Sequence, residues 1–113
     1  MGSDITDLLT KRGVVFTETD DLSRGTRDAD VVYMTRVQKE RFPDVDSYER
    51  LKGKYVLNRS SADALKETAI IMHPLPRVDE LLPEVDASPK AMYFKQASYG
   101  VSVRMALLTH LLS

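Results

Sequence analysis

The chain has 113 residues, and its 16 basic and 17 acidic side chains leave a formal net charge of -1. That length suits one compact domain, and a 42% hydrophobic share indicates a folded soluble protein without the basic stripe of a nucleic-acid or membrane-surface binder. Because there is no cysteine, disulfides, thiolate metal sites and a cysteine nucleophile are excluded, and we expect a cytoplasmic protein that does not enter membranes.

The first two thirds of the chain alternate helical patterns with short apolar runs. We expect helices near 4–12, 21–29, 45–51 and 60–65. We expect strands at 14–16, 31–34, 55–57 and 69–72. Ser3 or Asp4 is expected to cap the first helix, Gly13 to end it, and Ser60 or Ser61 to cap the fourth. Uniformly apolar strands have no solvent face, so the pattern predicts an α/β fold with a mainly parallel sheet of about four strands.

The alternation stops after Met72. Prolines punctuate the next stretch, and we expect residues 79–86, which are acidic, to form a solvated loop. Ser88 and Pro89 are a candidate N-cap and first residue for the C-terminal helices. After Gly100, apolar residues at helical spacing predict a final helix with a strongly apolar face. These residues are Val101, Met105, Leu108 and Leu112.

Candidate site residues follow the strands, because ligands of open parallel sheets bind at the carboxyl ends. The acidic turn at 17–20 suggests no ligand, and the polar run at 58–61 is more simply interpreted as a helix cap. Arg36 follows a buried strand, so its planar guanidinium could meet a carboxylate or phosphate in two hydrogen bonds, with Gln38 pointing the same way. The alternative is a solvated charged turn.

The run His73-Pro74-Leu75-Pro76 follows the last strand. Its two prolines restrict the backbone and remove two N–H donors, which leaves carbonyls as rigid acceptors for an NH₂ group. A stiff connector is the alternative. His73 could be a general base, but no nucleophile or orienting carboxylate can be assigned, and a structural role is favoured. The sequence shows no metal-ligand spacing and no glycine-rich phosphate loop, so we expect no metal and no cofactor.

Two segments, VYMTRVQKERF at 32–42 and MHPLPRVDE at 72–80, resemble signature segments of the aspartate carbamoyltransferases. The spacing between the two segments and the sequence of the tail at 84–108 are also similar to those of the family. The residues in these segments are nearest to the eukaryotic versions. The resemblance implies a three-layer, Rossmann-like α/β/α domain that binds L-aspartate. It further implies that residues 4–98 are part of that domain, that 99–113 pack on a carbamoyl-phosphate domain missing from the chain, and that 1–3 are an added leader.

The resemblance also assigns roles to individual residues. Arg36 would bind a carboxylate of L-aspartate and Gln38 would assist near its amino group. The carbonyls of Pro74 and Leu75 would contact the carbamoyl group of carbamoyl phosphate, and the bond from Leu75 to Pro76 would be cis. Ornithine carbamoyltransferases are the closest alternative, but they carry a cysteine where Pro74 stands.

The family's phosphate-gripping and catalytic-histidine segments do not occur in these 113 residues. We therefore expect the chain alone to be inactive, and to contribute in the full enzyme to a homotrimer, with fusion to other pyrimidine-pathway domains as a further expectation. A non-catalytic interaction or regulatory module of the same fold is another alternative, although Arg36, Gln38 and the 74–76 segment are intact. The chain should also expose apolar surface, chiefly on its last helix.

Overall fold

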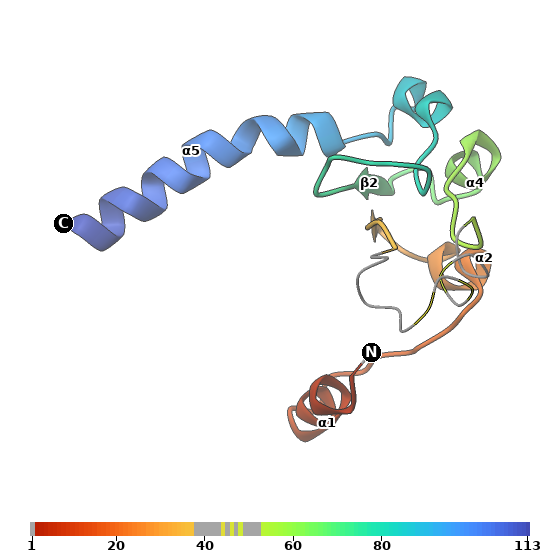
Figure 1. The fold of residues 1–113 in the computed structure, drawn as a ribbon, viewed down its shortest axis with the longest axis horizontal. Coiled ribbons are helices and arrows are strands. Elements are labelled where there is room, and N and C mark those ends of the chain that lie inside the picture. The colour runs from red at the N-terminus through yellow and green to blue at the C-terminus, as the bar shows by residue number, and fades with distance from the viewer. Residues whose placement is uncertain (1, 38–43, 45, 47, 49–52) are drawn as a thin grey trace.

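The computed structural model describes residues 2–37, 44, 46, 48 and 53–113. In chain order, the elements are α1 (Ser3–Lys11), α2 (Leu22–Thr26), β1 (Val31–Tyr33), α4 (Arg59–Asp63), β2 (Ile70–Met72), the 3₁₀ helix η2 (Pro83–Ala87) and α5 (Tyr93–Leu112) (Figure 1). The expected helix at 45–51 lies mostly outside the described residues. The remaining order of helices and strands is that of a small α/β fold.

The centre of the fold is a two-stranded parallel sheet formed by β1 and β2. Val32 pairs with Ile71 and Tyr33 with Met72, so the carboxyl ends of both strands lie at the same edge. Backbone hydrogen bonding continues one residue further, from Met34 N to Met72 O at 2.9 Å. The prediction of a parallel sheet is therefore confirmed for the strands at 31–33 and 70–72.

A hydrophobic core covers the sheet. Its buried members come from both strands, from α4 and from the segment after β2. They are Val32, Met34, Leu57, Ala62, Leu65, Ala69, Ile71, Leu81, Val85 and Tyr93. Burying each large apolar side chain contributes about 1.5–3 kcal/mol, so this cluster is the main stabilising contact between the strand ends and the helices around them.

Two apolar runs expected to be strands are not strands in the described structure. Residues 14–16 have no regular structure, and Val15 is 96% exposed. Within 55–57, only Leu57 forms a bridge, to Leu81. β-Branched residues favour strands only where a neighbouring strand takes up the backbone hydrogen bonds, and here none of the described strands lies beside residues 14–16.

Several predicted helix ends also need correction. Gly2 caps α1 without a side-chain bond, and Asn58 caps α4 by accepting the N–H of Ser61. Proline starts η2 at Pro83, whereas α5 begins after Met92 and not at Pro89. Asparagine accepts an N–H at a helix N-terminus as readily as serine does. Asn58 precedes the first turn of α4 and therefore caps it in place of Ser60 or Ser61. The predicted end of the first helix is confirmed, because Gly13 follows it with a φ of 66°.

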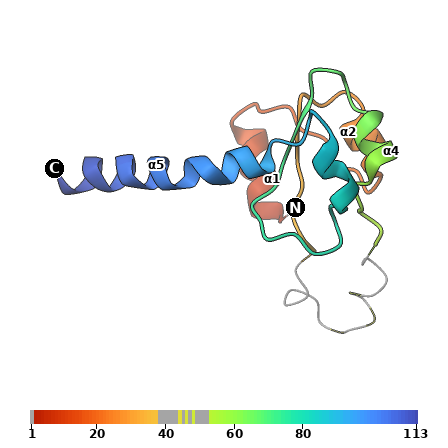
Figure 2. The same cartoon turned by 90° about the horizontal axis from the view of Figure 1, so that it is seen from above.

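Helix α5 is a single continuous helix that projects away from the sheet, as both views show (Figures 1 and 2). It runs through residues 98 and 99 without interruption. The radius of gyration is 16.6 Å, against roughly 13 Å for a compact chain of about 100 residues. Most residues of the projecting helix are exposed to solvent, and the helix increases the radius of gyration of the chain.

Candidate functional site

The carboxyl ends of β1 and β2 enclose a cavity of about 280 Å³. Thr35 and Arg36 line it from the end of β1, and residues 73–76 line it from the end of β2. The parallel register explains why two segments more than 30 residues apart face the same space. The structure thus brings together Arg36 and the Pro74–Pro76 loop, which the sequence analysis singled out separately, and Gln38 lies outside the described residues.

The loop after β2 has an unusual backbone. The peptide bond from Leu75 to Pro76 is cis, as the resemblance implies, and Leu75 has a φ of 50°. A positive φ is uncommon for a residue with a side chain and is found where the surroundings hold it. The loop therefore has a set backbone geometry where it lines the cavity.

His73 is buried and structural. Its side chain is 1% exposed, its Nδ1 accepts the N–H of Leu75 at 2.8 Å, and its Nε2 lies 2.7 Å from Oε1 of Glu80. Because Nδ1 accepts, the neutral ring carries its hydrogen on Nε2 and donates it to the carboxylate. Both ring nitrogens are engaged within the protein, which supports the structural interpretation over the general-base alternative.

Glu80 is the buried partner of His73, and the sequence analysis did not assign it. Its side chain is 4% exposed, and the Leu81 and Val85 side chains of the same stretch are fully buried, so the expected solvated loop at 79–86 is wrong. Burial by itself would raise the pKa of Glu80, but its own N–H, His73 and the N–H of Val78 together lower it. A carboxylate seven residues after a histidine has no local pattern that could have revealed the pair.

A second charged cluster ties the far side of this loop to α5. Arg77 donates two hydrogen bonds to Asp86, the second at 2.7 Å, and the Tyr93 hydroxyl donates to the same carboxylate. The guanidinium also lies over the rings of Tyr93 and Phe94. Hydrogen bonding from Arg77 is the main cause of the lowered pKa of Asp86, and burial with the Asp86 contact raises the pKa of Tyr93 to about 12.

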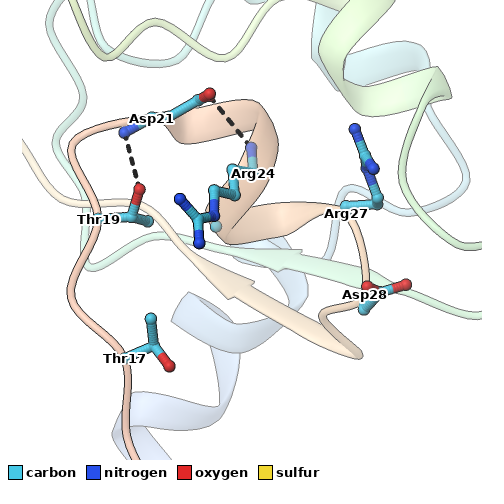
Figure 3. A pocket seen from close by; sticks show the side chains of 7 residues that line it. Thr17, Thr19, Asp21, Arg24, Arg27 and Asp28 are labelled. Carbon is cyan, nitrogen blue, oxygen red and sulfur yellow. Dashed lines mark hydrogen bonds between the residues drawn. The ribbon is translucent and has the colours of Figure 1, made fainter.

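A wider hollow of about 610 Å³ lies beside α2 (Figure 3). Arg24 and Arg27 project from the helix side, but the polar groups at its other side close the turn that precedes α2. Asp21 Oδ1 accepts the N–H of Arg24 at 3.1 Å, and Thr19 Oγ1 accepts the N–H of Asp21 at 3.2 Å. These are local capping bonds, so we assign no ligand to this hollow.

The described part of the chain shows neither a metal-binding cluster nor a membrane-spanning helix. Among those residues, no group of three or more histidines and carboxylates is placed to hold a metal ion. None of the helices they form is long and apolar enough to cross a membrane. The cavity at the strand ends is the candidate site, because it brings Arg36 and the loop at 73–76 to one place.

Comparison with known proteins gives the same result over nearly the whole chain. The family model for the aspartate/ornithine carbamoyltransferase Asp/Orn-binding domain matches residues 3–111. Aspartate carbamoyltransferase 2 of Pisum sativum is 50% identical over 99% of this chain and 29% of its own length. The catalytic subunit of M. jannaschii aspartate transcarbamoylase is 46% identical with a TM-score of 0.86, over 99% of this chain and 36% of its own. The Trypanosoma cruzi enzyme, solved with carbamoyl phosphate and aspartate, is 38% identical with a TM-score of 0.82, over 96% of this chain and 36% of its own.

A parallel sheet with a cavity at its carboxyl edge is typical of ligand-binding domains of the α/β class. The chain belongs to the aspartate/ornithine carbamoyltransferase family, as its Asp/Orn-binding domain. It spans about a third of the length of the relatives it matches. The relatives include plant, archaeal and protozoan enzymes, so the similarity is not confined to the eukaryotic versions.

Proposed function

We propose that this chain is the aspartate-binding part of an aspartate carbamoyltransferase, an enzyme of pyrimidine biosynthesis. Arg36 holds a carboxylate of L-aspartate, Gln38 assists near the amino group, and the carbonyls of Pro74 and Leu75 accept hydrogen bonds from the carbamoyl NH₂. The observation that carries the proposal is the cavity that Arg36 shares with residues 73–76. A guanidinium is a suitable partner for a carboxylate, and carbonyls are suitable partners for an amide NH₂.

The reaction follows from this placement of the two substrates. The amino nitrogen of aspartate attacks the carbonyl carbon of carbamoyl phosphate, the carbon–oxygen bond to phosphate breaks, and the nitrogen loses a proton. The products are N-carbamoyl-L-aspartate and phosphate. Such a transfer is accelerated mainly by holding the reactants in line and by stabilising charge on the carbonyl and the leaving phosphate. The residues of this chain supply the first of these contributions.

The aspartate interpretation is favoured over ornithine. All relatives described above are named as aspartate enzymes, and the T. cruzi relative was solved with both carbamoyl phosphate and aspartate. Pro74 stands where ornithine enzymes carry a cysteine, and Arg36 offers a guanidinium for the second carboxylate, which aspartate has and ornithine lacks.

The proposal extends to the complete protein. The segments at 14–16 and 55–57 would join the sheet of a three-layer, Rossmann-like domain there, which the exposure of Val15 supports. Residues 4–98 would belong to that domain and 99–113 would pack on a carbamoyl-phosphate domain. A homotrimer in the cytoplasm, with fusion to other pathway domains, follows from the family resemblance, although the pea relative is described as chloroplastic. Cell fractionation and sedimentation of the complete protein would test these points.

The test uses a complete catalytic chain of the M. jannaschii type whose matching segment is replaced by residues 3–111. Arg36→Ala should raise the KM for aspartate about 10- to 100-fold, the effect of losing a charge-assisted pair of hydrogen bonds, and change the KM for carbamoyl phosphate less than about threefold. Arg59→Ala, which removes an exposed ion pair with Asp63, is the matched control and should change neither. Equal losses for both substrates, or turnover of ornithine in place of aspartate, would contradict the proposal.

A further inference from the structure

His73 and Glu80 form a chain of hydrogen bonds that ends on the backbone of the proposed carbamoyl-binding loop. The carboxylate of Glu80 receives the Nε2 hydrogen of His73 at 2.7 Å, and Nδ1 of the same ring accepts the N–H of Leu75 at 2.8 Å. Glu80 also accepts the N–H of Val78, with both oxygens 3.3 Å from that nitrogen. The pair therefore holds the loop on both sides of Pro76.

From this we infer that His73, whose ring Glu80 orients, is a positioning residue that holds Leu75 so that its carbonyl and that of Pro74 face the carbamoyl group. The inference rests on the proposed function, and it adds a role for two residues to which that function assigns none. Leu75 lies at a φ of 50°, where a residue with a side chain stays only if its neighbours hold it. The hydrogen bond from the N–H of Leu75 to His73 is therefore placed to hold this backbone conformation.

The orientation of the ring is decided by its partners. If Nδ1 accepts from Leu75, Nε2 must carry the hydrogen, and Oε1 of Glu80 accepts it. A carboxylate fixes the histidine tautomer in the same way where a histidine ligates a metal or assists a serine nucleophile. Here the fixed ring nitrogen acts on the protein's own backbone. Burial of both side chains, at 1% and 4% exposed, keeps water from competing for these bonds.

Two substitutions separate the two ends of the chain of hydrogen bonds. His73→Asn places an amide oxygen at the depth of Nδ1, where it can still accept the N–H of Leu75, but it cannot reach Glu80. His73→Gln places its amide at the depth of Nε2, where it can still donate to Glu80, but it leaves Leu75 without an acceptor. Glu80→Gln keeps an acceptor oxygen for the ring and serves as the conservative variant of the other partner.

The experiment measures both KM values and kcat in the same complete chain that carries residues 3–111. His73→Gln should raise the KM for carbamoyl phosphate and lower kcat, each by about tenfold, as expected for one displaced hydrogen-bonding group, and His73→Asn by less than about threefold. The KM for aspartate should stay within about twofold for both. Val85→Ala, which lowers stability from a buried position in η2, should leave the KM for carbamoyl phosphate unchanged.

Equal effects of His73→Asn and His73→Gln, or effects on the aspartate KM alone, would overturn the inference. Arg36→Ala in the same background keeps the proposed function separate, because its aspartate effect does not depend on the loop. Should the His73 variants fail to fold, ¹⁵N spectra of the unchanged 113-residue chain decide the matter. They should show a neutral ring protonated at Nε2 and a Leu75 amide protected from exchange, and a ring protonated at Nδ1 would refute the inference.

Discussion

Gln96 on α5 donates a hydrogen bond from Nε2 to the hydroxyl of Tyr33 on β1, over a distance of 3.0 Å. Its other amide atom, Oε1, accepts the N–H of His73 at 3.3 Å. One side chain thus joins the projecting helix to the ends of both strands, next to the candidate site. The direction of α5 and the geometry of the strand ends are therefore mechanically linked.

Removing this link should destabilise the chain modestly. Gln96→Ala deletes both bonds, and we expect it to lower the free energy of unfolding by about 1–2 kcal/mol, while Tyr33→Phe, which deletes one exposed bond, should cost about 0.5–1 kcal/mol. Urea denaturation of the two single variants and of the double variant measures the coupling. Strictly additive losses would show that the bond between the two side chains contributes nothing.

The contact between Asp86 and Tyr93 should shape the dependence of stability on pH at both extremes. The folded pKa of Asp86 is lowered, chiefly by hydrogen bonding from Arg77, so its contribution is present above the ordinary value of 3.8 and is lost as pH falls through the folded value. Tyr93 has the opposite sign. Its folded pKa of about 12 exceeds the ordinary 10.0, so its contribution is present below pH 10.0 and is lost as pH rises toward 12.

Free energies of unfolding measured from acid to alkaline pH test both the loss of stability at low pH and the loss at high pH. Asp86→Asn should flatten the acid loss and Tyr93→Phe the alkaline loss. Tyr99→Phe, which removes the hydroxyl of an exposed tyrosine on the same helix, should leave the profile unchanged. If the loss of stability at high pH persisted in Tyr93→Phe, another group would be its cause.

Lys90 should matter more to stability than an ordinary surface lysine. Its Nζ donates to the carbonyls of Ala62 and Leu65 at 2.9 and 2.8 Å, and so satisfies acceptors at the end of α4. Lys90→Met should cost about 1–2 kcal/mol because these partly buried carbonyls lose their donor. Lys66→Met removes only an exposed pair with Asp30 and should cost less than about 0.5 kcal/mol. Thermal unfolding of both variants measures the difference, and equal losses would contradict it.

Helix α5 should make the isolated chain self-associate. Its exposed apolar side chains are not confined to the face expected from the sequence. They comprise Val101, Val103, Met105, Leu107, Leu108, Leu111 and Leu112. A helix that is apolar on several sides is normally covered on more than one of them. Sedimentation velocity should therefore show species larger than a monomer at micromolar concentration.

The double variant Leu108→Lys/Leu112→Lys should shift this distribution toward the monomer, because charges on the patch oppose association. His110→Lys, on the opposite side of the helix, serves as the control and should shift it less. If the unsubstituted chain sedimented as a monomer at every concentration, the exposed helix would not cause self-association.

The isolated 113-residue chain should form no detectable carbamoyl aspartate. Orientation of aspartate alone leaves the leaving phosphate without partners, and these 113 residues hold no recognised phosphate-gripping segment. A radiolabelled carbamoyl phosphate assay, with the complete chimeric chain as the positive control, measures this. Product formed by the isolated chain above the uncatalysed rate would contradict the expectation.

The sequence by itself determined where two strands lie and which candidate site residues follow them. Strands at 31–34 and 69–72 in a parallel sheet, and Arg36 and the 74–76 loop after them, could be predicted because apolar strand patterns and the residues that follow them are local features. Only the tertiary structure decided that Val15 is exposed and that Glu80 is buried against His73. Strand pairing and the burial of a charge both depend on partners distant in the chain, and no local pattern records such partners.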